Sequence, residues 1–213
     1  MYVRSGPVSD MNAADTIAAV EEATTTERSR IGSDKALISA TGADLSAHAI
    51  WAAAATREAG FADALGGWAT DAGGAADAVA EAFDRAATAA NERADRIDAA
   101  PGDTDALSTH LGSLEGTAER VGAGLVAPAL LFDRFYLQVV SFFVNEADER
   151  SADTARELRS GASDLDVARD ALAVLDESGR ERARDGAIEA VGVAYDEYAD
   201  ALEAMGLDPR PVC

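Results

Sequence analysis

The segment from Leu125 to Val144, LVAPALLFDRFYLQVVSFFV, constrains the fold more than any other part of the chain. It holds four of the six phenylalanines, and its only charged residues are the adjacent Asp133 and Arg134. A helix that is apolar on nearly every face is buried, either in a protein core or in a membrane. The uncharged runs beside the charged pair are far shorter than the roughly 20 residues that span a bilayer. We therefore expect the central helix of a soluble helical protein.

The chain is strongly acidic, with 39 Asp and Glu residues, 18 Lys and Arg residues and a formal net charge of -21. Such a surface binds water and cations, and it tolerates its own repulsion best where salt screens the charges to within a few ångströms. Abundant Ala, Asp and Glu beside a single lysine, Lys35, is typical of proteins from extreme halophiles. We therefore expect a salt-rich cytoplasm as the setting of this protein.

The same charge argues against direct nucleic-acid binding, because phosphate neutralisation needs clustered Lys and Arg side chains. The single cysteine, Cys213, excludes an internal disulfide, and it is expected to be an accessible tail cysteine. The sequence shows neither a signal peptide nor a long uncharged apolar span. These features predict an intracellular, soluble protein.

Glycines, prolines and capping residues divide the chain into predicted helices. Residues 1–11 are predicted to be a disordered leader, residues 12–206 one helical-bundle domain, and residues 207–213 a short non-helical tail. Apolar stripes at helical spacing predict helices over 12–30, 46–70, 75–99, 103–124, 128–159, 164–177 and 180–205. Strand alternation and hairpin turns are absent from the sequence. Long helices joined by short turns favour an all-α antiparallel bundle.

Four stretches carry a family resemblance: RIGSDKALISATGADL at 30–45, REAGFADALGGWA at 57–69, FYLQVVSFFVNEADERSADTARELR at 135–159, and the ending GLDPRPVC. On these stretches the chain resembles a group of haloarchaeal rubrerythrin-type, ferritin-like proteins, some of which carry a transcription antitermination label. The resemblance covers most of the chain after Met11 and implies a ferritin-like bundle. No residue supports the antitermination label, and a protein with this charge would have to act on transcription through protein partners.

A ferritin-like di-iron site takes carboxylates from four helices, two of them in Glu-x-x-His pairs, because the i, i+3 spacing puts both ligands on one helix face. The carboxylates placed well inside the four long predicted helices are Glu58, Glu92, Asp95, Glu146 and Glu189. Phe61 stands three residues after Glu58, and Gly192 three residues after Glu189. Glu-x-x-His occurs nowhere in the chain, so the di-iron signature is broken and the resemblance implies the scaffold rather than the activity.

Two functions follow from these observations. The favoured hypothesis is a non-catalytic, ferritin-like bundle with a degenerate di-iron site, a carboxylate-free centre, no catalytic, cofactor or metal residues, and no membrane contact. It would act through a protein partner or through self-association. The alternative is a rubrerythrin-like, metal-dependent oxidoreductase whose iron or manganese is held by the five carboxylates alone. Because the chain has 39 acidic residues, most of them are expected to be solvated surface charge.

The remaining polar residues with chemical potential are histidines and tyrosines. His48 and His110 fall near the starts of separate predicted helices, so we expect surface or boundary positions rather than metal ligation. Tyr136, Tyr195 and Tyr198 lie on apolar helices, where buried tyrosines ordinarily place their hydroxyls against a hydrogen-bond partner.

Overall fold

A computed structural model describes residues 11–71 and 77–210 of the chain, so Cys213 and nearly all of the predicted leader lie outside the described residues. Within these two ranges the protein is all-helical, without a strand, as the sequence predicts. The helices are α1 (Ala13–Ala23), α2 (Thr25–Ile31), α3 (Ala36–Thr41), α4 (Ala47–Asp71), α5 (Asp77–Ala94), α6 (Ala106–Ser113), α7 (Thr117–Val121), the π-helical turn η1 (Gly122–Val126), α8 (Ala127–Asn145), α9 (Glu149–Ala162), α10 (Asp166–Ala173) and α11 (Glu177–Ala204).

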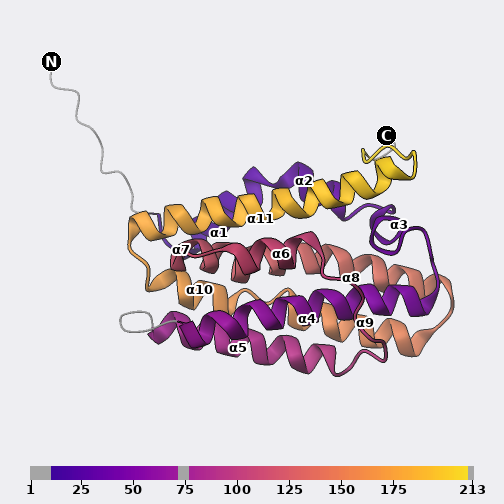
Figure 1. The fold of residues 1–213 in the computed structure, drawn as a ribbon, viewed down its shortest axis with the longest axis horizontal. Helices are drawn as coiled ribbons and strands as arrows, with labels where there is room; N and C mark the ends of the chain where they lie inside the picture. Colours follow the sequence, from indigo (N-terminus) through magenta and orange to yellow (C-terminus); the bar gives the residue numbers. More distant parts are fainter. Residues whose placement is uncertain (1–10, 72–76, 211–213) are drawn as a thin grey trace, which may run out of the picture.

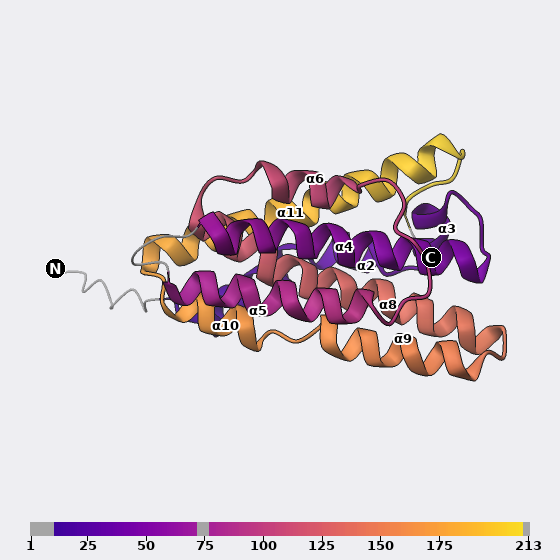
Figure 2. The same cartoon turned by 60° about the horizontal axis from the view of Figure 1, so that its bottom comes forward.

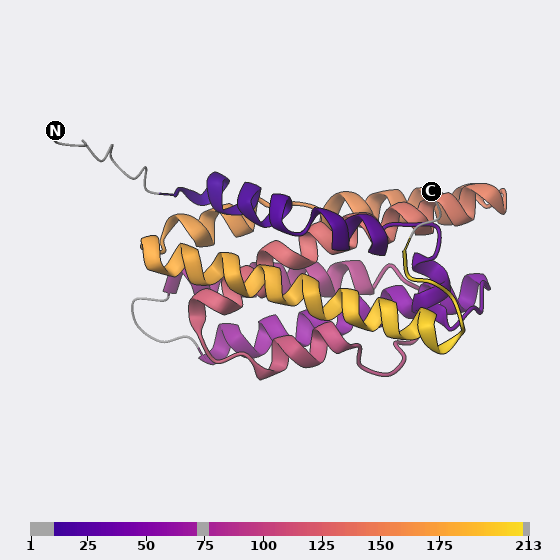
Figure 3. The same cartoon turned by 90° about the horizontal axis from the view of Figure 1, so that it is seen from above.

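The helices run along the long axis of an elongated bundle (Figure 1). Two hairpins, α4–α5 and α8–α9, lie beside each other (Figure 2). Helix α11, of 28 residues, extends along the opposite side, where α1 and α2 pack against it (Figure 3). That the described helices form a single domain stays a prediction.

Asparagine and aspartate side chains cap the N-termini of α1, α6, α9 and α11. Asn12 and Asp15 form a capping box at the start of α1, in which the side chain of each residue accepts a hydrogen bond from the backbone N–H of the other. Asp105, Asp148 and Asp176 each accept a backbone N–H bond at the start of α6, α9 and α11, at 2.8, 3.0 and 2.7 Å. Part of the chain's large aspartate content therefore satisfies the free amides of helix N-termini.

The central segment is buried as its composition predicts. Every residue from Val121 to Phe132 is buried, and Phe135, Tyr136, Val139 and Phe143 continue the buried face to the end of α8. Its phenylalanines bridge α8 to α4: Phe143 stacks on Trp51 with ring centroids 5.0 Å apart, and Phe132 meets Phe61 edge-on at 5.7 Å. These aromatic pairs fill the space between the two hairpins.

The sequence predicts that a helix ends near residue 124, just before the central helix, but the structure has no helix end there. The residues from Thr117 to Asn145 form one continuous helix of 29 residues, because the chain passes through the glycines in the π-helical turn η1 instead of ending there. By length and composition this helix is long enough to cross a membrane. Most of its apolar part is buried against the rest of the protein, which is consistent with the core helix of a soluble protein.

The prediction that the central helix continues to residue 159 is wrong. It ends at Asn145, and the chain reverses through Ala147, which takes a left-handed conformation at φ 57°. The Asp148 amide closes this turn on the Phe143 carbonyl at 2.9 Å, and the Asp148 side chain then caps α9. Without a glycine or proline at the turn, the sequence carries no breaker to mark it.

Asp133, one of the two charged residues of the central segment, connects the two helices of the α8–α9 hairpin. Two nitrogens of Arg159 on α9 lie 2.9 Å from Asp133 Oδ1 on α8. The interaction joins the two helices at a half-buried position, where it is less screened than an ion pair in water.

Candidate functional site

One carboxylate lies at the centre of the bundle. Glu58 on α4 is fully buried, with no exposed surface. Its carboxylate faces Arg93 of α5, whose Nε is 3.0 Å from both carboxylate oxygens and whose Nη2 is 2.9 Å from Oε2. Tyr136 of α8 donates its hydroxyl proton to Oε1 at 2.8 Å. Three helices therefore meet in one buried network, which we call the Glu58 network (Glu58, Arg93 and Tyr136).

The electrostatics of the Glu58 network are balanced internally. An unpaired carboxylate at this depth would be very unfavourable, and a guanidinium that contacts both of its oxygens neutralises it in the geometry that Arg and carboxylate prefer. Burial raises the pKa of the Tyr136 hydroxyl well above 10.0, and the negative charge of Glu58 and the hydrogen bond to it act in the same direction. The tyrosine is therefore a neutral donor over the whole physiological range.

The structure does not bring the five candidate carboxylates together. Glu58 is buried, whereas the side chains of Glu92, Asp95, Glu146 and Glu189 are exposed. Among residues 11–71 and 77–210, no group of three or more His, Cys, Asp and Glu side chains could hold a metal ion. The residues present therefore do not fit a carboxylate-only iron or manganese site, and the oxygens of Glu58 already bind Arg93 and Tyr136.

Helix register explains why Glu92 does not face the bundle centre. Successive residues of an α-helix point about 100° apart, so the buried position of Arg93 on α5 turns the preceding Glu92 toward solvent. The expectation of a carboxylate-free centre for a non-catalytic bundle is also wrong, because Glu58 lies there. The position is tolerable because a cation on the neighbouring helix compensates it.

Sequence reasoning missed Arg93, although the sequence contains a signal for it. Glu58 continues the apolar stripe of Ile50 and Ala54 at i+4 spacing, and Arg93 follows Ala90 at i+3 on the stripe of the next helix. Opposite charges on the inward stripes of two consecutive helices predict a buried ion pair, provided that both stripes are compared.

The histidines and the other tyrosines have structural environments. His48 is exposed at the start of α4, and His110 is half-buried on α6. Tyr195 accepts a hydrogen bond from Arg30 Nη1 at 2.7 Å, while the buried Tyr198 hydroxyl lies 3.0 Å from Ser33 Oγ and 3.2 Å from the Pro209 carbonyl oxygen. The expected surface or boundary positions of the histidines and the hydrogen-bonded tyrosine hydroxyls are confirmed, but Tyr195 is half-buried rather than buried.

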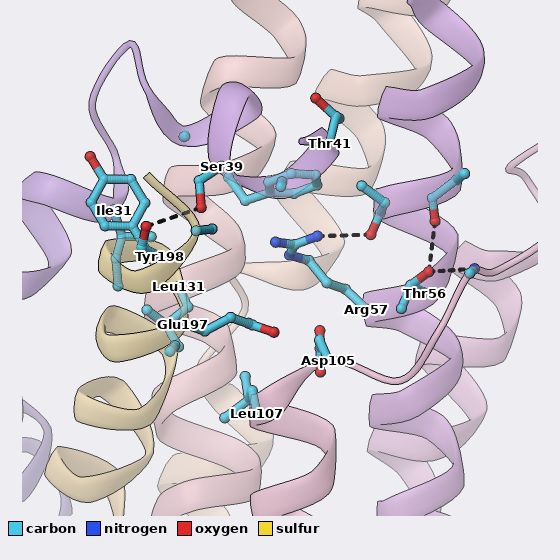
Figure 4. Close-up of a pocket in the computed structure, with 18 of the residues that line it drawn as sticks. Ile31, Ser39, Thr41, Thr56, Arg57, Asp105, Leu107, Leu131, Glu197 and Tyr198 are labelled. Carbon is cyan, nitrogen blue, oxygen red and sulfur yellow. Dashed lines mark hydrogen bonds between the residues drawn. The ribbon is translucent and has the colours of Figure 1, made fainter. Parts of the chain in front are cut away.

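A pocket of about 520 Å³ opens beside the Glu58 network. Its walls come from α3, α4, α8 and α11, and the segment that connects α5 to α6 crosses it (Figure 4). The Gly102 amide of that segment donates to Thr56 Oγ1 at 2.7 Å, which fixes the segment to α4. The remaining surface is largely apolar, with Leu107, Leu131 and Phe135 among the lining residues.

Charged side chains enter this pocket from separate elements. Arg57 of α4 lies over the Phe135 ring, with its guanidinium carbon 4.2 Å from the ring centroid, and its Nη1 donates to the Ala53 carbonyl at 2.9 Å. Glu197 reaches the pocket from α11, and Asp105 reaches it from the segment just before α6 (Figure 4). None of the carboxylates in the described part of the chain lies within 4.0 Å of the Arg57 nitrogens.

Comparison of the chain with models of protein families, with curated proteins and with solved structures found no match in any of the three.

Proposed function

We propose that the protein is a non-catalytic, ferritin-like helical bundle in which an Arg–Glu ion pair occupies the position of a metal centre. The protein would act by binding protein partners or further copies of itself. The Glu58–Arg93 pair is the observation that carries this proposal.

The chemistry of the pair supports a scaffold over a redox enzyme. A di-iron centre needs several carboxylates and histidines that converge from facing helices. In this bundle the buried carboxylate of Glu58 is neutralised by a buried guanidinium, and a cation placed beside Arg93 would meet a like charge. The four other candidate ligands are exposed, so a metal would have to draw them inward against the packing of α5, α8 and α11.

The proposed contact surface lies at the ends of the helices. The large hydrophobic residues exposed on the described surface are Leu45, Val144, Val174 and Leu207. Leu45 precedes α4, Val144 is near the end of α8, and Leu207 follows α11; these three element ends lie at one end of the bundle (Figures 1–3). We infer that association takes place at this end, where it would bury three of the four large apolar side chains exposed on the described surface.

The proposed setting is the cytoplasm of a haloarchaeal or similar salt-accumulating cell. The net charge of -21 supports it, because molar salt shortens the range of charge repulsion to about 3 Å.

Metal analysis tests the scaffold proposal. The full chain, purified in molar KCl without chelator, would be exposed to Fe(II) or Mn(II), desalted and analysed for bound metal. We expect much less than one equivalent per chain, with the same value for Glu58→Gln and for the matched exposed variant Glu92→Gln. About two equivalents per chain, lost in both variants, would support the rubrerythrin-like oxidoreductase instead.

Association is tested by light scattering over a range of protein concentrations. If the apolar end mediates self-association, Val144→Asp lowers the mass of the assembly, whereas Val174→Asp on the α10 side leaves it unchanged. A monomer at all concentrations would restrict the proposal to a different protein partner, and a complex disrupted equally by both variants would contradict the assignment of this end.

A further inference from the structure

We propose that the pocket between α4, α8 and α11 binds a small zwitterion with an apolar body, such as a free amino acid with a large apolar side chain or a dipeptide of such residues. The ligand's carboxylate would bind Arg57, and its protonated amine would bind Asp105 and Glu197. This inference rests on the pocket alone and is independent of a ferritin-like ancestry.

Arg57 is prepared to bind a carboxylate. Its guanidinium carbon lies over the Phe135 ring, 4.2 Å from the centroid, and Nη1 donates one hydrogen bond to the Ala53 carbonyl at 2.9 Å. A guanidinium has five N–H donors, so donors along its edge remain for a ligand in the pocket. Two parallel N–H bonds to one carboxylate are the geometry in which Arg recognises this group.

The carboxylates of Asp105 and Glu197 are held apart from Arg57. Glu197 Oε1 accepts the Ala106 amide at 2.9 Å, and Asp105 Oδ1 accepts the Ser108 amide at 2.8 Å. These bonds fix both carboxylates at the edge of the pocket that Arg57 enters from α4, and neither lies within 4.0 Å of the Arg57 nitrogens (Figure 4). The pocket therefore presents a fixed positive site and a fixed negative site to one occupant.

The pocket surface beside the charged groups suits the apolar side chains of such a ligand. Leu107, Leu131, Phe132 and Phe135 line the pocket together with several alanines. The pocket volume of about 520 Å³ falls within the range of roughly 300–1,000 Å³ that is usual for small-molecule sites. The body of the ligand would be desolvated there while its two charged groups meet opposite partners.

The charge arrangement excludes simpler ligands as good matches. A phosphate or other anion would satisfy Arg57 but would face the carboxylates of Asp105 and Glu197, and it would approach a protein of net charge -21. A simple amine would pair with the carboxylates of Asp105 and Glu197, but it would supply no anion to pair with Arg57. A zwitterion pairs with both the carboxylates and Arg57, and it carries no net charge.

Calorimetric titration of the full chain in molar KCl tests the proposal, with leucine, phenylalanine and leucyl-leucine as probes. Two modified ligands separate the charges: N-acetyl-leucyl-leucine lacks the protonated amine, and leucyl-leucinamide lacks the carboxylate. We expect at least one zwitterion to bind, and each modified form of the dipeptide to bind about tenfold more weakly than leucyl-leucine.

Variants assign the two ends of the ligand. Arg57→Met should weaken leucyl-leucine about tenfold and leave leucyl-leucinamide unchanged, whereas Glu197→Gln should weaken leucyl-leucine and leave the N-acetyl form unchanged. Arg85→Met is the matched control, because Arg85 is exposed and pairs with Asp170 on the surface. Ala194→Phe fills the pocket without changing a charge, and it should abolish binding even if Arg57→Met does not fold.

Absence of binding by all three zwitterions up to about 10 mM would overturn the proposal. It would also be overturned if Arg85→Met weakened binding as much as Arg57→Met, or if Ala194→Phe bound like the unmodified protein. Tighter binding of the N-acetyl form than of leucyl-leucine would show that the site prefers anions and would contradict the role of Asp105 and Glu197.

Discussion

The guanidinium of Arg93 contacts both carboxylate oxygens of Glu58, with Nε 3.0 Å from each and Nη2 2.9 Å from Oε2. Glu58 has no exposed surface, and the Arg93 side chain is 10% exposed. A buried ion pair adds little net stability compared with apolar residues of the same volume, but the loss of one partner leaves the other charge buried and uncompensated. The pair therefore favours the one register of α4 against α5 in which both charges are matched.

Removal of the Tyr136 hydroxyl tests the third member of the Glu58 network. Tyr136→Phe deletes the 2.8 Å bond to Glu58 Oε1 and should lower the free energy of unfolding by about 1.5–3 kcal/mol, because hydrogen bonds to charged groups are stronger than average. Denaturant unfolding in molar KCl measures this. Tyr195→Phe, at a half-exposed position, is the control and should have a smaller effect. Equal losses of unfolding free energy in the two variants would contradict a stronger hydrogen bond to the charged Glu58.

The free energy of unfolding should also depend on Tyr136 at alkaline pH. Its pKa is raised well above 10.0 in the folded protein, chiefly by burial and then by Glu58. The unfolded chain therefore loses the Tyr136 proton first, so the stabilising effect is complete below about pH 10 and declines as pH rises further, by up to about 1.4 kcal/mol per pH unit. Tyr136→Phe should lose this part of the pH dependence. If tyrosinate absorbance showed all tyrosines of the folded protein ionising together near pH 10, the burial of this hydroxyl would be contradicted.

Two glycine substitutions should have opposite effects. A Cβ on Gly122 would overlap the Ala183 carbonyl of α11, so Gly122→Ala should lower the free energy of unfolding by about 1–3 kcal/mol or more. A Cβ on Gly192, within α11, would meet nothing within 4 Å, and Gly192→Ala should raise stability by about 0.5–1 kcal/mol through helix propensity. Denaturant midpoints of the two variants provide the comparison. Stabilisation by Gly122→Ala would contradict the close approach of η1 to α11.

Salt should stabilise the fold. The net charge of -21 repels itself over about 10 Å at 0.1 M salt and over about 3 Å at 1 M. The thermal midpoint should therefore rise between these KCl concentrations, and the largest part of the rise should come at low salt. Equal concentrations of NaCl separate general screening from a specific effect of potassium. A midpoint that does not change with salt would contradict the proposed salt-rich setting.

The buried parts of the fold were the easiest to predict, because burial leaves a pattern in the sequence. The all-helical class and the core position of the Leu125–Val144 segment follow from helical periodicity and from the concentration of phenylalanine there. The turn at Ala147 was not predictable in this way. A left-handed alanine is unfavourable by about 1–2 kcal/mol, and it persists because α9 then packs on α8.

The candidate site was predictable only in part, for a related reason. Glu58 can be recognised from its place on a helix stripe, but its partner depends on how α4 faces α5, which no single helix pattern gives. The pocket is further from prediction, because Arg57, Asp105 and Glu197 come from three separate elements that only the packing of α4, α6 and α11 brings together.

A double-mutant cycle on Glu58 and Arg93 tests the central claim most directly. Glu58→Gln, Arg93→Met and the double variant would be unfolded by denaturant in molar KCl. We predict a loss of about 3–5 kcal/mol for each single variant and a loss for the double variant that is smaller than their sum by about 2–3 kcal/mol. Additive losses, with Arg93→Met equally harmful whether or not Glu58 is present, would contradict the ion pair as the occupant of the bundle centre.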